Sequence, residues 1–166
     1  MATGIILAGG ESSRMGEDKS LIHSNVTRLA NEMRKSGCNR IIVMCGTQKR
    51  SSLFNEECIL DSAETLAESL LGVLSGIEGL VQLAPCDAYL ADAELFSAIE
   101  GVPTDDSGLR QPLLAGFDAT TKLVNSVRLS DMFSLLPSCE GGIKARNTNT
   151  PEQLREVRSL LLKDGR

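Results

Sequence analysis

The sequence predicts an α/β protein, a three-layer α/β/α sandwich around a mostly parallel sheet. Short apolar runs without polar alternation recur along the chain, as is typical of strands buried on both faces. Segments with helical periodicity separate these runs, which favours helices on both faces of the sheet. The first apolar run ends in a glycine-rich loop, at the kind of position where such sheets bind ligands.

The first half of the chain is expected to contain four strands and two helices. The strands are expected at residues 4–8, 40–45, 58–60 and 80–84, and the helices at residues 21–36 and 62–77. Leu66, Leu70 and Leu74 recur at helical spacing in the second helix, and Gly37 provides a stop for the first.

The second half has weaker patterns. Helices are expected at residues 92–100 and 123–136, a loop at 102–110, and strands at 111–117 and 143–146. Pro112 restricts its strand to an edge or a strand start. Thr150 and Pro151 predict the start of a final helix, with threonine as the cap and proline in the first turn. No linker or repeat divides the chain, so one domain over residues 1–166 is expected.

Composition and charge exclude several classes of protein. The net charge of -5 argues against general nucleic-acid binding, which requires a basic surface. No apolar run approaches the roughly 20 residues that span a bilayer, and no signal segment precedes the first strand. A cytoplasmic protein without a membrane partner is therefore expected. The five cysteines form no C-x-x-C pair and are expected to be reduced and partly buried.

The loop after the first strand has the composition of a polyanion site. Gly9 and Gly10 permit close approach of a ligand to the main chain, and Arg14 and Lys19 add two positive charges. The spacing does not fit a Walker A loop, because Asp18 precedes Lys19 where glycine is required. The dinucleotide motif G-x-G-x-x-G is also absent. These features predict binding of a nucleotide.

Residues 7–19 fit the pattern L-A-G-G-x-S-x-R-M-G-x-D-K position for position. This pattern resembles that of the Rossmann-like nucleotidyltransferases, in particular the molybdenum cofactor guanylyltransferases. The resemblance implies GTP as donor, a molybdopterin-like phosphorylated acceptor and Mg²⁺ as cofactor. It further implies a nucleotide-binding half (1–87) and an acceptor-binding half (88–166). Arg14 and Lys19 would act on the triphosphate, and the nucleotide would contact Leu7, Ala8 and the two glycines.

Asp87 is the second strong feature of the sequence. It follows a buried strand at the carboxyl end, where α/β sheets bind ligands, and Mg²⁺ typically takes only one or two protein carboxylates beside phosphate oxygens. A catalytic, nucleotide-binding and metal-binding role agrees with the family resemblance, which includes a P-C-D segment like Pro85–Asp87. The alternative is that Asp87 caps the following turn.

Four further segments match the same family, one of them only weakly. The resemblance implies that Asp61 contacts the guanosine, whereas the residue taken by itself is more typical of a cap for the next helix. The resemblance also implies that Asn149, or Asn147, supplies a second metal contact. The alternative is that these residues have only loop and capping roles. Gln111 lies in a Q-P-L element that the family uses on the acceptor side. The segment 72–76 matches the family's G-P-L-A-G element only weakly, because the proline is missing.

The chain also departs from the family pattern. It lacks a Gly-Gly-x-Pro-like turn after Lys19, and Cys45-Gly46 stands where an asparagine is common. Alternative activities are therefore a cytidylyltransferase for molybdopterin, or a guanylyltransferase for cobinamide phosphate or another small phosphorylated acceptor. A nucleotide-binding regulator without turnover is a further alternative. The partners could also include other proteins of cofactor biosynthesis.

Overall fold

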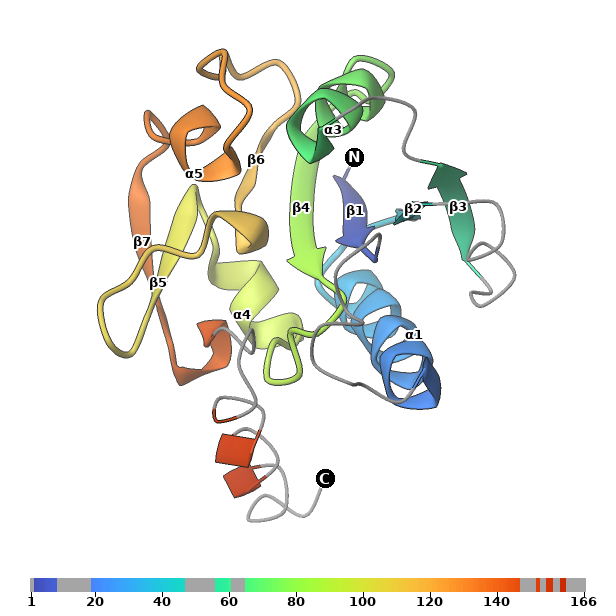
Figure 1. Ribbon diagram of the computed structural model, residues 1–166, viewed down its shortest axis with the longest axis vertical. Coiled ribbons are helices and arrows are strands. Elements are labelled where there is room, and N and C mark those ends of the chain that lie inside the picture. The colour runs from blue at the N-terminus through green and yellow to red at the C-terminus, as the bar shows by residue number, and fades with distance from the viewer. Residues whose placement is uncertain are drawn as a thin grey trace.

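The computed structural model describes residues 2–8, 19–46, 56–60 and 65–146, together with residues 152, 155, 156, 159 and 160. The side chains of residues 19–23 and 46 are outside this description. Its central five-stranded sheet has the order β3-β2-β1-β4-β6 (Figure 1). The strands are β1 (Ala2–Leu7), β2 (Arg40–Gly46), β3 (Glu57–Leu60), β4 (Leu80–Pro85) and β6 (Gly116–Asp118). Only β6 is antiparallel to its neighbour, so the predicted mostly parallel sheet is confirmed.

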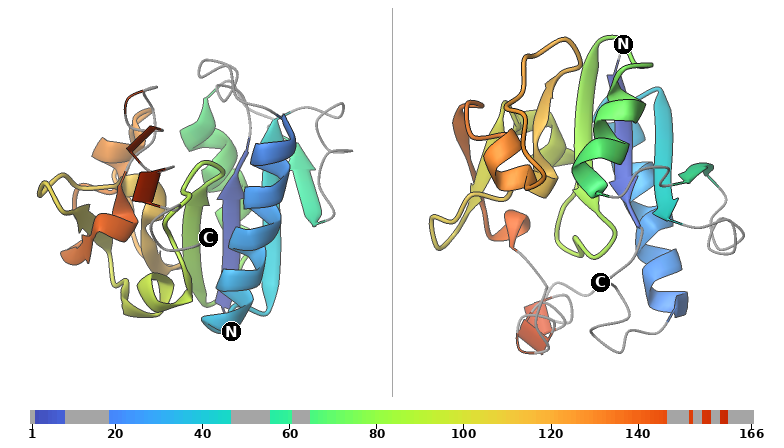
Figure 2. Two further views of the ribbon diagram at one scale, coloured as in Figure 1. Left: turned by 90° about the horizontal axis from the view of Figure 1, so that it is seen from below. Right: turned by 45° about the horizontal axis from the view of Figure 1, so that its top comes forward.

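Helices cover both faces of the sheet, as Figures 1 and 2 show. One face carries α1 (Lys19–Lys35) and α4 (Ala93–Ala98), and the other carries α3 (Leu66–Leu74) and α5 (Leu129–Met132). Successive strand residues alternate between two apolar clusters: Ile6 packs in the cluster of α1, and Ile5 in the cluster of α3. Burial on both faces explains why the strands are continuously apolar, and it confirms the three layers.

The expected elements of the first half are present. All four strands and the helix after the glycine-rich loop form within a few residues of their expected bounds. The helix expected at 62–77 is shorter and begins at Leu66. Thr65 caps it, because its side-chain oxygen accepts a hydrogen bond from the amide of Glu68 (3.2 Å).

The second half corrects several predictions. The expected loop at 102–110 contains a strand, β5 (Val102–Asp105), which pairs in parallel with β7 (Ser138–Gly142). The helix expected at 123–136 is reduced to the four residues of α5. The strand expected at 111–117 is split into a 3-10 turn, η2 (Pro112–Leu114), and β6. The strand expected at 143–146 is a 3-10 turn, η3 (Ile143–Ala145). These elements are too short for side-chain periodicity to define them.

The five cysteines are free thiols, and three of them are buried, as predicted. The expected cap of the final helix, Thr150, lies outside the described residues, although residues 152, 155, 156, 159 and 160 are helical. Within the described residues, no helix is both long and apolar enough to cross a membrane.

Candidate nucleotide site

β1 and β4 are parallel neighbours, so both strands end at the same edge of the sheet (Figure 1). Leu7 is paired with Pro85, and the amide of Cys86 donates a hydrogen bond to the carbonyl oxygen of Leu7 (3.0 Å). The amide of Ala8 donates to the carbonyl oxygen of the neighbouring strand β2, at 2.9 Å. Asp87 therefore leaves the sheet directly beside the point where the chain enters the glycine-rich loop.

Asp87 is half-buried in a tight turn after β4. The amide of Ala88 donates to the carbonyl oxygen of Pro85 (3.1 Å), and the amide of Tyr89 donates to the main-chain carbonyl of Asp87 (2.9 Å). The next helix, α4, is capped by Asp92, whose Oδ1 accepts the amide hydrogen of the third helical residue at 3.0 Å. Asp87 thus lies at the carboxyl edge of the sheet, and the helix α4 has its own cap in Asp92.

Most other residues of the expected site lie outside the described part of the chain. They are Gly9, Gly10, Arg14, Asp61, Asn147 and Asn149. Lys19 is the first residue of α1, but its side chain belongs to the same undescribed set. The roles of these residues remain predictions.

The described residues just before the Asn147–Asn149 segment contact the residue that caps α4. Ala145 is fully buried in the apolar cluster that also contains Ala88. The adjacent Lys144 forms an ion pair with Asp92, with a distance of 2.7 Å between Nζ and Oδ2.

Two residues of α1 that were not singled out from the sequence bind the Asp87 turn. Asn25 is only 5% exposed, and its Nδ2 donates to the carbonyl oxygen of Cys86 (2.7 Å). Arg28 donates from Nη2 to the carbonyl of Ala88 (2.9 Å) and from Nη1 to that of Ala91 (2.7 Å). The Nε of Arg28 also donates to Oδ1 of Asn25 (2.9 Å). The sequence signal was slight: two polar residues at i and i+3 beside the apolar stripe of the helix.

Gln111 is half-buried just before η2. Its Nε2 donates to Oδ2 of Asp105 (3.0 Å), and its amide donates to the carbonyl oxygen of Pro103 (2.8 Å). Both contacts hold it against β5. Its predicted role on the acceptor side stays a prediction.

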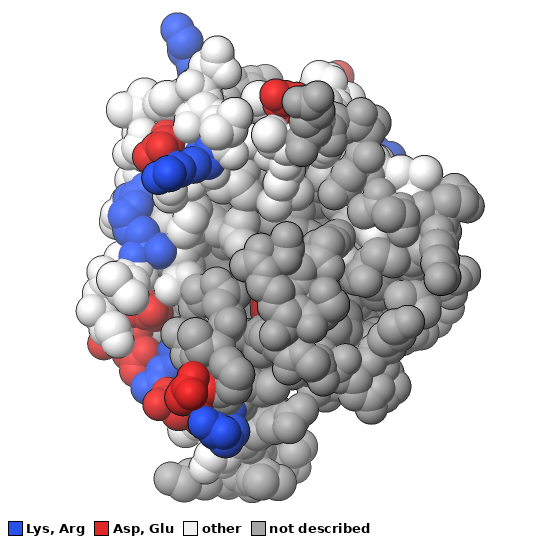
Figure 3. Space-filling model, in the orientation of Figure 1, with Lys and Arg blue, Asp and Glu red and all other residues white. Residues whose placement is uncertain are grey.

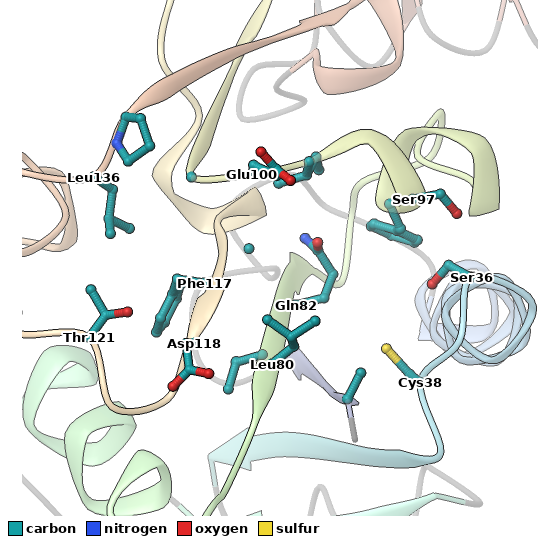
Figure 4. A pocket seen from close by; sticks show the side chains of 17 residues that line it. Ser36, Cys38, Leu80, Gln82, Ser97, Glu100, Phe117, Asp118, Thr121 and Leu136 are labelled. Atoms are coloured by element: carbon teal, nitrogen blue, oxygen red, sulfur yellow. The ribbon is translucent and has the colours of Figure 1, made fainter.

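A cavity of about 540 Å³ opens at the opposite edge of the sheet, near the amino ends of β1 and β4 (Figure 4). Apolar side chains such as Leu80 and Phe117 line much of it, together with the amide of Gln82. Glu100 and Asp118 also line it, and no Lys or Arg is among its described lining residues. A triphosphate would meet carboxylates there instead of cations, so this cavity does not suit a nucleotide.

Charged side chains of both signs alternate along the side of the molecule that carries β5 and β7 (Figure 3). Arg146 pairs with Asp106 (2.7 Å between Nη2 and Oδ2), and its hydrogen bond holds the pKa of Asp106 below the usual value. Lys144 has a raised pKa, because Asp92 and Glu94 accept hydrogen bonds from its ammonium group. These cations are already held by carboxylates. The cations for a triphosphate are therefore expected from the glycine-rich loop.

A mostly parallel sheet, a glycine-rich loop after its first strand and an aspartate after the neighbouring strand define a domain of the nucleotidyltransferase class. The family model of the MobA-like NTP transferase domain matches residues 4–124, which include both the loop and Asp87. The chain belongs to this family.

Three related proteins carry the name molybdenum cofactor guanylyltransferase. The relative from Mesorhizobium japonicum is 33% identical over 54% of this chain and 46% of its own length. The relative from Cupriavidus metallidurans is 30% identical over 70% of this chain and 62% of its own length. The relative from Cupriavidus pinatubonensis is 28% identical over 93% of this chain and 85% of its own length. The chain thus spans less than two thirds of the first two relatives.

Solved structures support the fold. A protein from Aquifex aeolicus superposes with a TM-score of 0.63 at 23% identity, covering 93% of this chain and 90% of that one. The 4-diphosphocytidyl-2C-methyl-D-erythritol synthase from Anaerococcus prevotii superposes with a TM-score of 0.62 at 13% identity, covering 97% and 98%. At these identities, the likeness establishes the architecture only.

Proposed function

We propose that this protein is a Mg²⁺-dependent guanylyltransferase that transfers GMP from GTP to molybdopterin and releases pyrophosphate. The family membership and the names of the three relatives support this proposal. The structural observation that carries it is the hydrogen bond from the amide of Cys86 to the carbonyl oxygen of Leu7, which joins the start of the Asp87 turn to the end of β1.

In the proposed reaction, a phosphate oxygen of the acceptor attacks the α-phosphorus of GTP. A new bond forms between this oxygen and the phosphorus, and the bond between the α-phosphorus and the bridging oxygen to the β-phosphate breaks. The reaction depends on in-line positioning and on neutralising the charge of the leaving pyrophosphate. Lys19 and Arg14 supply positive charge, the main chain of residues 7–10 and Asp61 hold the nucleotide, and Gln111 lies on the acceptor side.

The proposed ion is Mg²⁺, which needs few protein carboxylates, and Asp87 supplies one at the carboxyl edge of the sheet. Among the described residues, no group of three or more His, Cys, Asp or Glu side chains could hold a metal ion. Mg²⁺ commonly keeps waters and phosphate oxygens beside one or two carboxylates. Asp87, with Asn149 as the second candidate, would hold the ion, and the bound ion would neutralise charge on the phosphates.

The roles of Asp87 and Lys19 can be tested by measuring pyrophosphate release with GTP, Mg²⁺ and molybdopterin. We expect Asp87→Asn and Lys19→Ala each to lower turnover by roughly 10²- to 10³-fold, because each removes a group that stabilises developing charge. The matched controls Asp131→Asn and Lys122→Ala alter exposed residues of the same types and should retain turnover. Near-normal turnover in both site variants would contradict the proposed roles.

The same assay separates the alternative functions. Replacing GTP by CTP identifies a cytidylyltransferase, and replacing molybdopterin by cobinamide phosphate tests the other acceptor. GTP binding without pyrophosphate release, with every acceptor tried, would instead indicate a nucleotide-binding regulator.

A further inference from the structure

Three polar residues of α1 form a strip along the helix face that meets the segment after β4. Asn25, Arg28 and Glu32 are spaced i, i+3 and i+7, which places them on one side of the helix. Asn25 and Arg28 donate to three carbonyl oxygens of residues 86–91. Glu32 accepts a hydrogen bond through Oε1 from the amide of Ala93 (3.3 Å). The α1 strip thus forms hydrogen bonds with main-chain atoms of this segment. These contacts do not depend on which side chains the segment carries.

These contacts fix the main chain on both sides of Asp87. The carbonyl of Cys86, which accepts from the α1 strip, belongs to the peptide unit that joins it to Asp87. Ala88, whose carbonyl oxygen also accepts from the strip, is the residue after Asp87. From the sheet, the carbonyl oxygen of Leu7 holds the amide of Cys86. The backbone at residue 87 is therefore held from α1 and β1 together.

The same helix begins at the last residue of the glycine-rich loop. Asn25 follows Lys19 by six residues of continuous helix, a rise of about 9 Å. A helix moves as a unit over this length. The distance between the start of α1 and the Asp87 turn is consequently fixed by the α1 strip.

We infer that Asn25 and Arg28 are positioning residues, which hold Asp87 in register with the start of α1 for a divalent cation bound to a nucleoside triphosphate. The inference rests on the proposed function for its ligand. Loss of Arg28 leaves two carbonyl acceptors without their charged donor, and such loss inside a protein loosens the segment that carries them. Changes in the groups that orient a metal ligand typically lower metal affinity by roughly 10- to 100-fold.

Arg28→Met tests the inference, with Arg34→Met as the matched control. Arg34 lies on the same helix but is exposed and pairs with Glu56, away from the Asp87 turn. Two quantities are measured: amide hydrogen exchange of residues 86–91 without ligand, and the affinity for Mn²⁺ in the presence of GTP by electron paramagnetic resonance. We expect faster exchange and a 10- to 100-fold weaker Mn²⁺ affinity in Arg28→Met, and neither change in Arg34→Met. Arg28→Lys, which keeps the charge and one donor, should recover part of both effects.

Faster exchange with unchanged Mn²⁺ affinity would overturn the inference, since the α1 strip would then be only structural. Unchanged exchange would overturn it as well. Should Arg28→Met fail to fold, the same two measurements on Arg28→Lys test the inference. Even partial loosening of residues 86–91 must then weaken Mn²⁺ binding. If the wild type binds Mn²⁺ and GTP but releases no pyrophosphate, the proposed transfer reaction fails while the positioning role stands.

Discussion

At the scale of single residues, the polar groups inside the protein mainly hold main-chain segments. Gln82 is 7% exposed in the middle of β4, and its Nε2 donates to the carbonyl oxygens of Leu83 and Leu114, both at 2.8 Å. Gly116 lacks a Cβ where one would lie 2.8 Å from Oε1 of this glutamine. The glutamine within this apolar strand thus has a structural role: it binds a carbonyl oxygen of the 3-10 turn η2.

Cys58 gives a pH-dependent prediction at the same scale. Burial raises its pKa to about 11, and the neighbouring thiol of Cys45 contributes to the increase. Because the thiolate is the reactive form, about one molecule in a thousand carries it at about pH 8, and the fraction rises tenfold per pH unit up to the pKa. The rate at which iodoacetamide alkylates Cys58, measured by peptide mass spectrometry, should therefore keep rising from about pH 8 up to the pKa of about 11. A plateau near about pH 9, as in a free cysteine peptide, would contradict the raised pKa.

The residues of the site differ in how far the sequence could predict them. The position of Asp87 at the carboxyl edge of the sheet could be predicted because a buried strand ends just before it, and its role stays a prediction. Asn25 and Arg28 could not, because their function is to bind carbonyl oxygens more than 50 residues away, and the sequence gives no pattern for such contacts.

At the scale of helices and strands, the first half of the fold was predictable because most of its elements are long or strongly apolar, and even the short β3 contains the apolar run 58–60. The second half was not, since β5 with four residues and β7 with five are too short and too polar to display a period. The pairing of β5 with β7 joins segments more than 30 residues apart, so it depends on tertiary contacts.

The junction of these two strands gives a stability prediction. Gly101, directly before β5, has a φ of 95°, and a Cβ there would lie 2.1 Å from the carbonyl oxygen of Pro137. Gly101→Ala should therefore lower the free energy of unfolding by about 2–4 kcal/mol, through backbone strain and steric overlap. Urea denaturation measures this loss.

Gly108→Ala is the matched control for that substitution. Gly108 has a similar φ of 85°, but nothing lies within 4 Å of its hypothetical Cβ. Its loss should be only the cost of the left-handed conformation, about 1–2 kcal/mol. Equal losses in the two variants would show that the contact with Pro137 is unimportant.

At the scale of the whole molecule, the two edges of the parallel sheet carry different features. The carboxyl edge brings together the end of β1, the start of α1 and the Asp87 turn, whereas the amino edge carries the apolar cavity near Gln82. The two apolar clusters on either face of the sheet hold the strands that define these edges. Fold and site are thus linked: the parallel pairing of β1 with β4 is what brings the end of β1 and Asp87 together.

The most direct test of this account is a crystal structure with a non-hydrolysable GTP analogue and Mg²⁺. We predict that a carboxylate oxygen of Asp87 binds the ion at about 2.1 Å, and that Lys19 contacts the same triphosphate. A triphosphate bound elsewhere, or an ion that does not contact Asp87, would contradict the proposed convergence of the loop and Asp87 on one nucleotide.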